Sequence, residues 1–180
     1  MASVTCGGRL RVAEGDKLCS KPNKKIKPLV GDNVLIDVID EDNKKGNISD
    51  ILERKNELIR PASANIDQAM VIFAVKSPEP NYNLLDRFIL MMDYQDVPTV
   101  VVFNKTDLVE EKDIEELRKI YEKCGCKVIF ISAYDNTGID ILIDTLKDKT
   151  TILAGPSGVG KSSLTNIILP YRKEEGEISK

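Results

Sequence analysis

The chain has 180 residues, of which 42% are hydrophobic, and this is enough to bury the core of one or two domains. No segment resembles a signal peptide and no apolar run approaches the length of a bilayer span, so we expect a soluble protein without a membrane partner. The net charge of −3 is uneven: residues 1–30 carry seven basic and two acidic side chains, a net of +5, which leaves −8 for residues 31–180. A basic front on an acidic body indicates a local contact with a polyanion rather than general affinity for nucleic acid.

The four cysteines, at positions 6, 19, 124 and 126, indicate a reduced, cytoplasmic setting. Their spacing matches neither a disulfide framework nor a C-x-x-C motif, and the chain has no histidine that could complete a mixed zinc site. The segment Cys124-Gly125-Cys126 lies where a charged helix is expected to end. Small residues at a helix end explain this segment better than a metal or redox role.

Residues 1–60 predict a small β-barrel. Short apolar stretches alternate here with turn residues, and residues 34–39 show the period of two that is typical of a half-buried strand. A polar loop carries four lysines that are candidates for contact with an RNA backbone, namely Lys21, Lys24, Lys25 and Lys27. A solvated loop explains the same lysines, and the residues alone favour that interpretation. Because no aromatic residue precedes residue 67, we expect any RNA contact to be electrostatic, without base stacking.

Residues 61–66 lack periodicity and are interpreted as a linker. From residue 67 onward, strand patterns alternate with helix patterns, which predicts an α/β fold with a parallel sheet flanked by helices. The expected strands cover 70–75, 97–103, 127–132 and 151–154, and the expected helices cover 84–92, 112–123, 139–146 and 162–169. Asn83 is expected to cap the first of these helices and Pro170 to end the last. Ligands of such sheets bind at the carboxyl ends of the strands.

The strand expected over 97–103 leads into N-K-T-D, a candidate guanine-reading motif. The carboxylate of Asp107 can accept from the ring N–H and the exocyclic amine of guanine, whereas adenine has no such pair of donors. Asn104 can bond the O6/N7 side of the base, and the stem of Lys105 can lie over it. Taken alone, the four residues are explained equally well by a solvated turn that Thr106 or Asp107 caps.

Ser132-Ala133 ends the next expected strand, 28 residues after Asn104. A small residue here lets a backbone N–H approach guanine O6, a contact that the amine of adenine would oppose. The segment Asp135-Asn136-Thr137-Gly138 follows and fits the D-x-x-G pattern of GTPases. It lies at the base end of the ligand, however, and is therefore interpreted as a turn with Gly138 at the start of a helix.

The strand expected over 151–154 leads into G-P-S-G-V-G-K-S, a complete phosphate-binding loop in the strand–loop–helix context that the motif requires. Its glycines let successive backbone N–H groups turn onto phosphate oxygens, and the following helix adds its positive end. We expect Lys161 to stabilise charge on the β- and γ-phosphates and the Ser162 hydroxyl to hold Mg²⁺. The predicted nucleotide contacts are Asn104, Lys105, Thr106, Asp107, Ser132, Ala133, Gly155, Pro156, Ser157, Gly158, Val159, Gly160, Lys161, Ser162 and Ser163.

In this order, with the guanine motifs before the phosphate loop, the chain resembles the circularly permuted GTPases that assist maturation of the small ribosomal subunit in bacteria. The resemblance covers nearly the whole chain. K-P-L-V-G-D, at residues 27–32, looks like the OB-fold of that family, and residues 60–67 follow it as they do there. The implied architecture is an OB-fold barrel over 1–60 followed by a circularly permuted P-loop GTPase domain over 67–180.

The resemblance implies a hydrolase that converts GTP to GDP and phosphate, is stimulated by the small ribosomal subunit, and contacts ribosomal RNA. It also implies that the switch regions and a C-terminal zinc domain follow Lys180, so no residue that positions the attacking water can be named. We expect a monomer, because no long apolar surface or heptad pattern is present. As given, the chain is expected to bind nucleotide, and its turnover is left open.

Two other functions remain open at this point. A guanylate-kinase-like phosphotransferase would share the phosphate loop, but it would leave N-K-T-D and Ser132-Ala133 unexplained. A passive RNA-binding module, gated by guanine nucleotide without turnover, would fit the same motifs, and a hydrolysis assay separates it from an enzyme.

Overall fold

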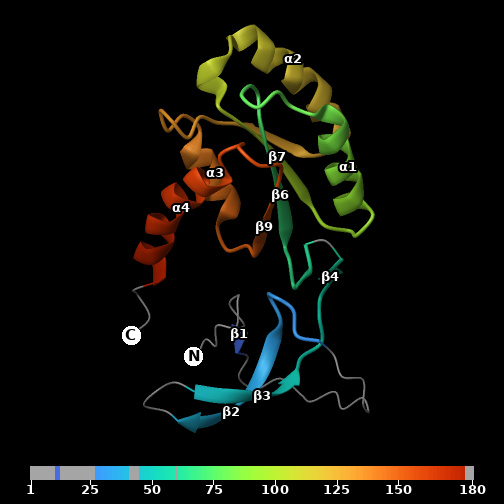
Figure 1. The fold of residues 1–180 in the computed structure, drawn as a ribbon, viewed down its shortest axis with the longest axis vertical. Coiled ribbons are helices and arrows are strands. Elements are labelled where there is room, and N and C mark those ends of the chain that lie inside the picture. The colour runs from blue at the N-terminus through green and yellow to red at the C-terminus, as the bar shows by residue number, and fades with distance from the viewer. Residues whose placement is uncertain (1–10, 13–26, 41–44, 60, 177–180) are drawn as a thin grey trace. The chain divides into compact units, whose positions relative to one another are not determined.

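The computed structural model describes residues 11–12, 27–40, 45–59 and 61–176 (Figure 1). The chain divides into two compact units, Met1–Ile66 and Asp67–Lys180, which are described separately below. Within the described ranges, no helix is long and apolar enough to cross a membrane.

The first unit is built from short strands. Strand β1 (Arg11–Val12) pairs parallel with β2 (Asn33–Asp40), and β2 pairs antiparallel with β3 (Lys45–Ile51). A second, two-stranded antiparallel pair joins β4 (Glu57–Leu58) to β5 (Ser63–Ala64). The strand pattern expected over 34–39 is confirmed by β2, where Val34 is fully buried. That these strands belong to a closed barrel stays a prediction.

Residues 61–66 are not the linker that the sequence predicted. They contain β5, whose Ala64 is fully buried and donates its N–H to Val30 O at 2.8 Å, and they belong to the first unit. Asn65 adopts a left-handed conformation, and its side-chain amide donates to Gly31 O at 2.9 Å. The side-chain oxygen of Asn65 accepts from the N–H of Lys55 at 2.8 Å. Side-chain bonds, rather than periodic apolar residues, hold this segment in place.

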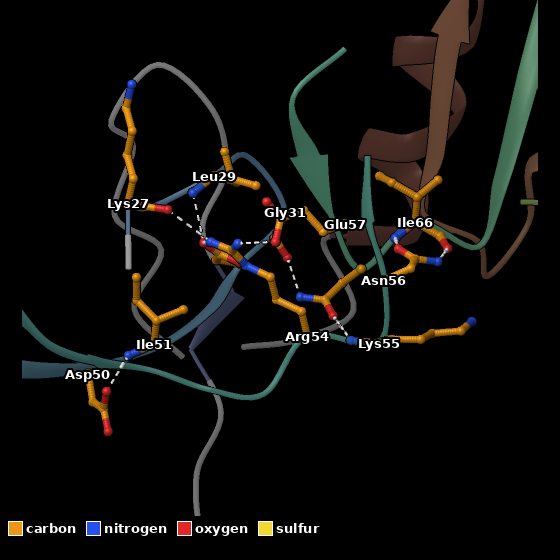
Figure 2. Close-up of polar contacts among 12 residues, drawn as sticks. Lys27, Leu29, Gly31, Asp50, Ile51, Arg54, Lys55, Asn56, Glu57 and Ile66 are labelled. Atoms are coloured by element: carbon orange, nitrogen blue, oxygen red, sulfur yellow. Dashed lines mark hydrogen bonds and ion pairs between the residues drawn. The ribbon is translucent and has the colours of Figure 1, made fainter. Parts of the chain in front are cut away.

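A buried ion pair anchors the turn before β2. Asp32 is fully buried and accepts from Arg54 through both carboxylate oxygens, at 2.6 Å from Nε and 2.8 Å from Nη2. Its Oδ2 also accepts from the N–H of Leu29 at 2.7 Å. Figure 2 shows the guanidinium of Arg54 reaching the backbone carbonyl of Lys27, at 2.9 Å from Nη2. A further bond at 2.7 Å joins Arg54 to Glu57. The bond to Asp32 raises the pKa of Arg54 above its usual value, so the guanidinium stays charged throughout the accessible pH range.

The second unit is the predicted parallel sheet with helices. Its described strands are β6 (Gln68–Ala74), β7 (Thr99–Asn104), β8 (Lys127–Phe130) and β9 (Thr151–Ala154), which pair in the order β8-β7-β6-β9. All three pairings are parallel. β6 is buried along its whole length, as expected for a strand in the middle of a sheet that is covered on both faces.

The helices cover the two faces of this sheet in pairs (Figure 1). Helix α1 (Tyr82–Asp93) and α2 (Glu111–Tyr121) pack over a cluster that includes Phe73 and Phe103. Helix α3 (Ile139–Leu146) and α4 (Lys161–Gly176) pack over the opposite cluster, which includes Ile72. The side chains of alternate residues of β6 therefore pack into the two cores, one on each face of the sheet. The unit is a three-layer α/β structure.

The expected helices and strands of the second unit are found, although most of their bounds differ by one or more residues. Asn81, not Asn83, caps α1, because its side chain accepts from the N–H of Leu84 at 3.0 Å. α4 does not end at Pro170 but continues to Gly176. A proline within a helix removes one backbone hydrogen bond and need not end it. α2 is followed by a 3₁₀ turn, η2 (Glu122–Cys124), and Gly125 lies in the left-handed conformation after it, which confirms the interpretation of this segment as a helix end.

Candidate nucleotide site

Three predicted motifs lie at one edge of the second sheet. N-K-T-D begins at Asn104, the last residue of β7, Ser132 follows β8, and Gly155 follows β9. Since all these strands are parallel, their carboxyl ends share an edge, and the order of the motifs along the chain does not affect their meeting there.

The strands end at different levels at this edge of the sheet, which leaves space for the phosphate loop above the end of β9. Ala74 of β6 lies level with Asn104, whereas β9 ends at Ala154, level with Val71. β9 therefore stops three residues lower, a difference of about 10 Å at the rise of a strand. The loop that starts at Gly155 occupies this space.

Two glycines of the phosphate loop fit where no side chain could. Gly155 has a φ of 144°, and a Cβ on it would lie 2.1 Å from the carbonyl oxygen of Ile72. Gly160 has a φ of 96°, and its Cβ would lie 2.4 Å from Nδ2 of Asn104. Between them, Val159 is buried with the core on the α3–α4 face. The loop is thus fixed against β6 and against the N-K-T-D motif.

The remaining residues of the loop face outward or begin α4. Ser157 and Gly158 are exposed, and Pro156 is half-buried. The Nζ of Lys161 donates to the carbonyls of Gly155 and Pro156, so the ammonium group lies against the loop. The first helical bond runs from Leu164 N to Gly160 O at 3.0 Å, and the first amides of α4 therefore have no partner within the helix.

Asn104 joins all three motifs. Its side chain is 1% exposed, its Nδ2 donates to Val159 O at 2.8 Å, and its Oδ1 accepts from the N–H of Ala133 at 3.1 Å. Asn104 and the N–H of Ala133 are each predicted from the sequence to contact the base, whereas in the structure they bond to each other. The chief task of Asn104 is therefore to hold the phosphate loop and the Ser132-Ala133 segment together.

Lys105 connects a different set of loops. It has the left-handed conformation, with a φ of 65°. Its Nζ donates to Gly158 O at 2.9 Å and to the carbonyl of Ser77, which follows β6. The segment at Ser77-Pro78 was missed by the sequence analysis. A turn-forming S-P-E-P run directly after a buried strand was the signal that could have located it.

A serine holds the carboxylate of Asp107, the residue that the sequence predicts to read the base. Asp107 is exposed, and its Oδ1 accepts from the hydroxyl of Ser132 at 2.6 Å. Ser132 itself is fully buried. Thr106, the first residue of the 3₁₀ turn η1 (Thr106–Leu108), donates its N–H to Ile131 O at 3.2 Å. These contacts join the end of β7 to the end of β8.

The D-x-x-G segment is a turn, as predicted. The N–H of Thr137 donates to Asp135 Oδ1 at 3.0 Å, which lowers the pKa of that carboxyl below its usual value. Ser132 pairs with Thr137 across the turn, and Gly138 is the N-cap residue of α3. The segment therefore lies beside Ser132-Ala133, which the sequence predicts to contact the base.

The residues present fit a magnesium ion held mainly by phosphate. Ser162 and Ser163 are exposed in the first turn of α4, next to the phosphate loop. A hydroxyl oxygen is a suitable ligand for Mg²⁺, which usually takes only one or two protein ligands beside the phosphates. In the described part of the chain, no group of three or more Asp, Glu, Cys or His side chains could hold a metal by itself.

Of the four lysines predicted to contact RNA, only Lys27 lies within the described residues, and the contact stays a prediction. Lys27 is exposed, while its backbone carbonyl accepts from Arg54. Lys21, Lys24 and Lys25 lie outside the described residues. Lys27 belongs to the first unit and the nucleotide residues to the second.

Comparison with known proteins agrees with these features. Residues 51–180 match the family model described as RsgA GTPase. The chain is 54% identical over 157 residues to the small ribosomal subunit biogenesis GTPase RsgA of Agathobacter rectalis, and 52% identical over 157 residues to that of Alkaliphilus metalliredigens. These matches cover 87% of this chain and 52% and 54% of the two relatives. The chain thus spans about half the length of the curated relatives it matches.

Two solved structures are also similar. YjeQ from Thermotoga maritima matches with a TM-score of 0.71 and 34% identity, over 90% of this chain and 56% of its own. YloQ, described as a circularly permuted GTPase, matches with a TM-score of 0.66 and 37% identity, over 92% of this chain and 56% of its own.

Proposed function

Because this chain belongs to the RsgA GTPase family, we propose that it binds GTP and GDP and hydrolyses GTP to GDP and phosphate during late maturation of the small ribosomal subunit. The observation that supports this most directly is the side chain of Asn104. It bonds to the guanine segment at Ala133 and to the phosphate loop at Val159, so that both halves of a guanine nucleotide site are assembled at one edge of the sheet.

Each end of the nucleotide has its own contacts in this proposal. Asp107, oriented by Ser132, accepts from the two donors of guanine. The N–H of Ala133 is shared between Asn104 and guanine O6 in a three-centre bond. At the other end, the amides of the loop and of the first turn of α4 bind the phosphate oxygens.

Lys161 stabilises the negative charge of the phosphates in this proposal. Its ammonium group exchanges the carbonyls of Gly155 and Pro156 for the β- and γ-phosphates when the nucleotide binds. The Ser162 hydroxyl would hold Mg²⁺, which would supply positive charge to neutralise the phosphates. The residue that positions the attacking water is expected among the switch regions, which the resemblance places after Lys180 together with a zinc domain.

The partner proposed for the first unit is ribosomal RNA of the small subunit. Lys27 is exposed on a loop whose backbone Arg54 holds, and this arrangement supports a contact with phosphates. Such contacts are weakened by salt in proportion to the number of phosphates neutralised. We propose that the protein acts in the bacterial cytoplasm as a monomer.

The first test is a titration of the chain with fluorescent GDP and ADP in the presence of Mg²⁺. A strong preference for GDP is expected, because adenine lacks the donor pair that Asp107 accepts from. Lys161→Ala should abolish binding, whereas Lys123→Ala, an exposed lysine after α2, is the matched control and should bind normally. Equal binding of GDP and ADP would reduce the site to a generic phosphate loop.

Turnover requires a second test with the whole protein. GTP hydrolysis should rise when small ribosomal subunits are added at low salt. Absence of stimulation under these conditions would favour the passive, guanine-gated module over the enzyme.

A further inference from the structure

Tyr134 is exposed beside the residues that read the base. It follows Ala133 at the tip of the turn between Ser132 and Thr137, and 89% of its surface is exposed. Single exposed apolar residues are common on protein surfaces and need no explanation by themselves. The position of Tyr134 is what distinguishes it from the other exposed rings.

The backbone of Tyr134 is bonded to the base-reading carboxylate through one serine. Its N–H donates to Ser132 Oγ at 3.3 Å, and the same hydroxyl donates to Asp107 Oδ1 at 2.6 Å. The N–H of Asp135 also donates to Ser132 Oγ, at 3.4 Å. The turn that carries the ring is therefore fixed relative to Asp107, so a ligand that engages Asp107 and Ala133 has the tyrosine as its direct neighbour.

Three other rings of the second unit pack in its core. Phe73 and Phe103 are fully buried, and Tyr121 packs against Phe103 with ring centroids 5.4 Å apart. These rings belong to the core under α1 and α2. Tyr134 takes part in neither core cluster of this unit, so its ring can pack against a ligand without disturbing the fold.

We propose that the phenol ring of Tyr134 stacks on the purine base of the bound nucleotide and slows its release. This inference rests on the proposed function, since it requires a guanine nucleotide in the site. Stacking of a base on an aromatic side chain depends little on which base is present, because every base has a π-face. Tyr134 is therefore expected to set affinity and residence time, while Asp107 sets the choice of base.

A tryptophan reporter tests the contact directly. The chain contains no tryptophan, so Tyr134→Trp introduces a single one. Its fluorescence should change when GDP is added with Mg²⁺, because the indole lies against the base. Tyr94→Trp is the matched control: Tyr94 is 87% exposed and lies at the end of α1, so its emission should not respond.

Binding measurements give the second readout. Tyr134→Ala should weaken GDP affinity about tenfold, within the range observed when a base loses one aromatic stacking partner. Most of the effect should appear as faster dissociation, as is usual for changes within one interface. Tyr134→Phe keeps the ring and should stay within about twofold of the original chain, and a loss caused only by a disturbed turn would not be restored in this way.

The division of tasks between the two residues provides the decisive comparison. In an Asp107→Asn background, Tyr134→Ala should lower the affinity for xanthosine diphosphate. The factor should be the same as that by which Tyr134→Ala lowers the affinity for GDP in the original chain. An unchanged tryptophan signal together with an unchanged dissociation rate, in variants that bind GDP, overturns the stacking proposal alone. Failure of the original chain to bind GDP overturns the proposed function, and the stacking proposal with it.

Discussion

Replacing Asp32 by asparagine should destabilise the first unit by about 3 to 5 kcal/mol, the cost of breaking a buried ion pair by removing one partner. The carboxylate is fully buried and accepts three hydrogen bonds, two from Arg54 and one from the N–H of Leu29. A carboxamide of the same shape has one acceptor oxygen, and an NH2 group that only donates takes the place of the second oxygen. At least one of the three N–H groups would then face another donor, and Arg54 would lose its buried partner and keep only the exposed carboxylate of Glu57.

Urea denaturation followed by NMR is the suitable assay. Tyrosine fluorescence does not report on the first unit, because no aromatic residue precedes residue 67. Leu29 lies in the turn and Ala64 in β5, and the backbone N–H of each donates a hydrogen bond within the unit. Their amide signals therefore report on the folded state of this unit. The decrease of the two native signals with urea concentration gives the midpoint and the slope of the unfolding transition, and these give the free energy of unfolding.

Asp50→Asn is the matched control. Asp50 is exposed in β3, and its carboxylate accepts a local bond from the N–H of Ile51 at 2.8 Å (Figure 2). The same chemical change should there shift stability by no more than about 0.5 kcal/mol. If Asp32→Asn cost no more than Asp50→Asn, the ion pair with Arg54 would not be what holds the turn, and the reasoning from burial would be wrong.

Three further predictions concern the second unit. Asp107→Asn should shift preference from guanine to xanthine, because a carboxamide can donate to the xanthine carbonyl; unchanged GDP affinity would mean that Asp107 does not read the base. Gly160→Ala should abolish nucleotide binding in a calorimetric titration, since its Cβ would lie 2.4 Å from Nδ2 of Asn104, and normal binding would contradict the fit described for the loop. Burial and a neighbouring carboxylate raise the pKa of Tyr121 above 10.0, so its contribution to stability is complete below about pH 10 and is lost as the pH rises further. The urea midpoint between pH 9 and 11 should therefore fall less steeply in Tyr121→Phe than in the original chain, and equal slopes would exclude this residue as the cause.

The second unit was largely predictable because its signals are local. The helix expected over 139–146 and the strand expected over 151–154 have the bounds seen in α3 and β9. Continuous apolar runs such as that of β6 identify strands covered on both faces, and complete motifs identify the loops that follow them. Motif chemistry and strand order were therefore sufficient to place the candidate site at the carboxyl edge.

The errors occurred where side-chain bonds decide the conformation. The linker expected over 61–66 contains a two-residue strand that the amide of Asn65 fixes to Gly31, 34 residues earlier. No periodicity reveals such a bond. In the same way, the motifs predicted the presence of Asn104 in the site but not its bonds to Val159 and Ala133, because these depend on the register of three separate strands.

The strand order also explains why a lysine is needed after Asn104. β7 and β9 lie on opposite sides of β6, so the two strands are about 10 Å apart at the usual spacing, and β9 also ends three residues lower. Lys105 leaves the end of β7 and reaches both Ser77, after β6, and Gly158, in the loop after β9. Only a long, flexible side chain with several donors can join loops from three strands in this way. Circular permutation changes the order of these loops along the chain but not the distance between the strand ends, so the lysine has the same span to bridge in either order.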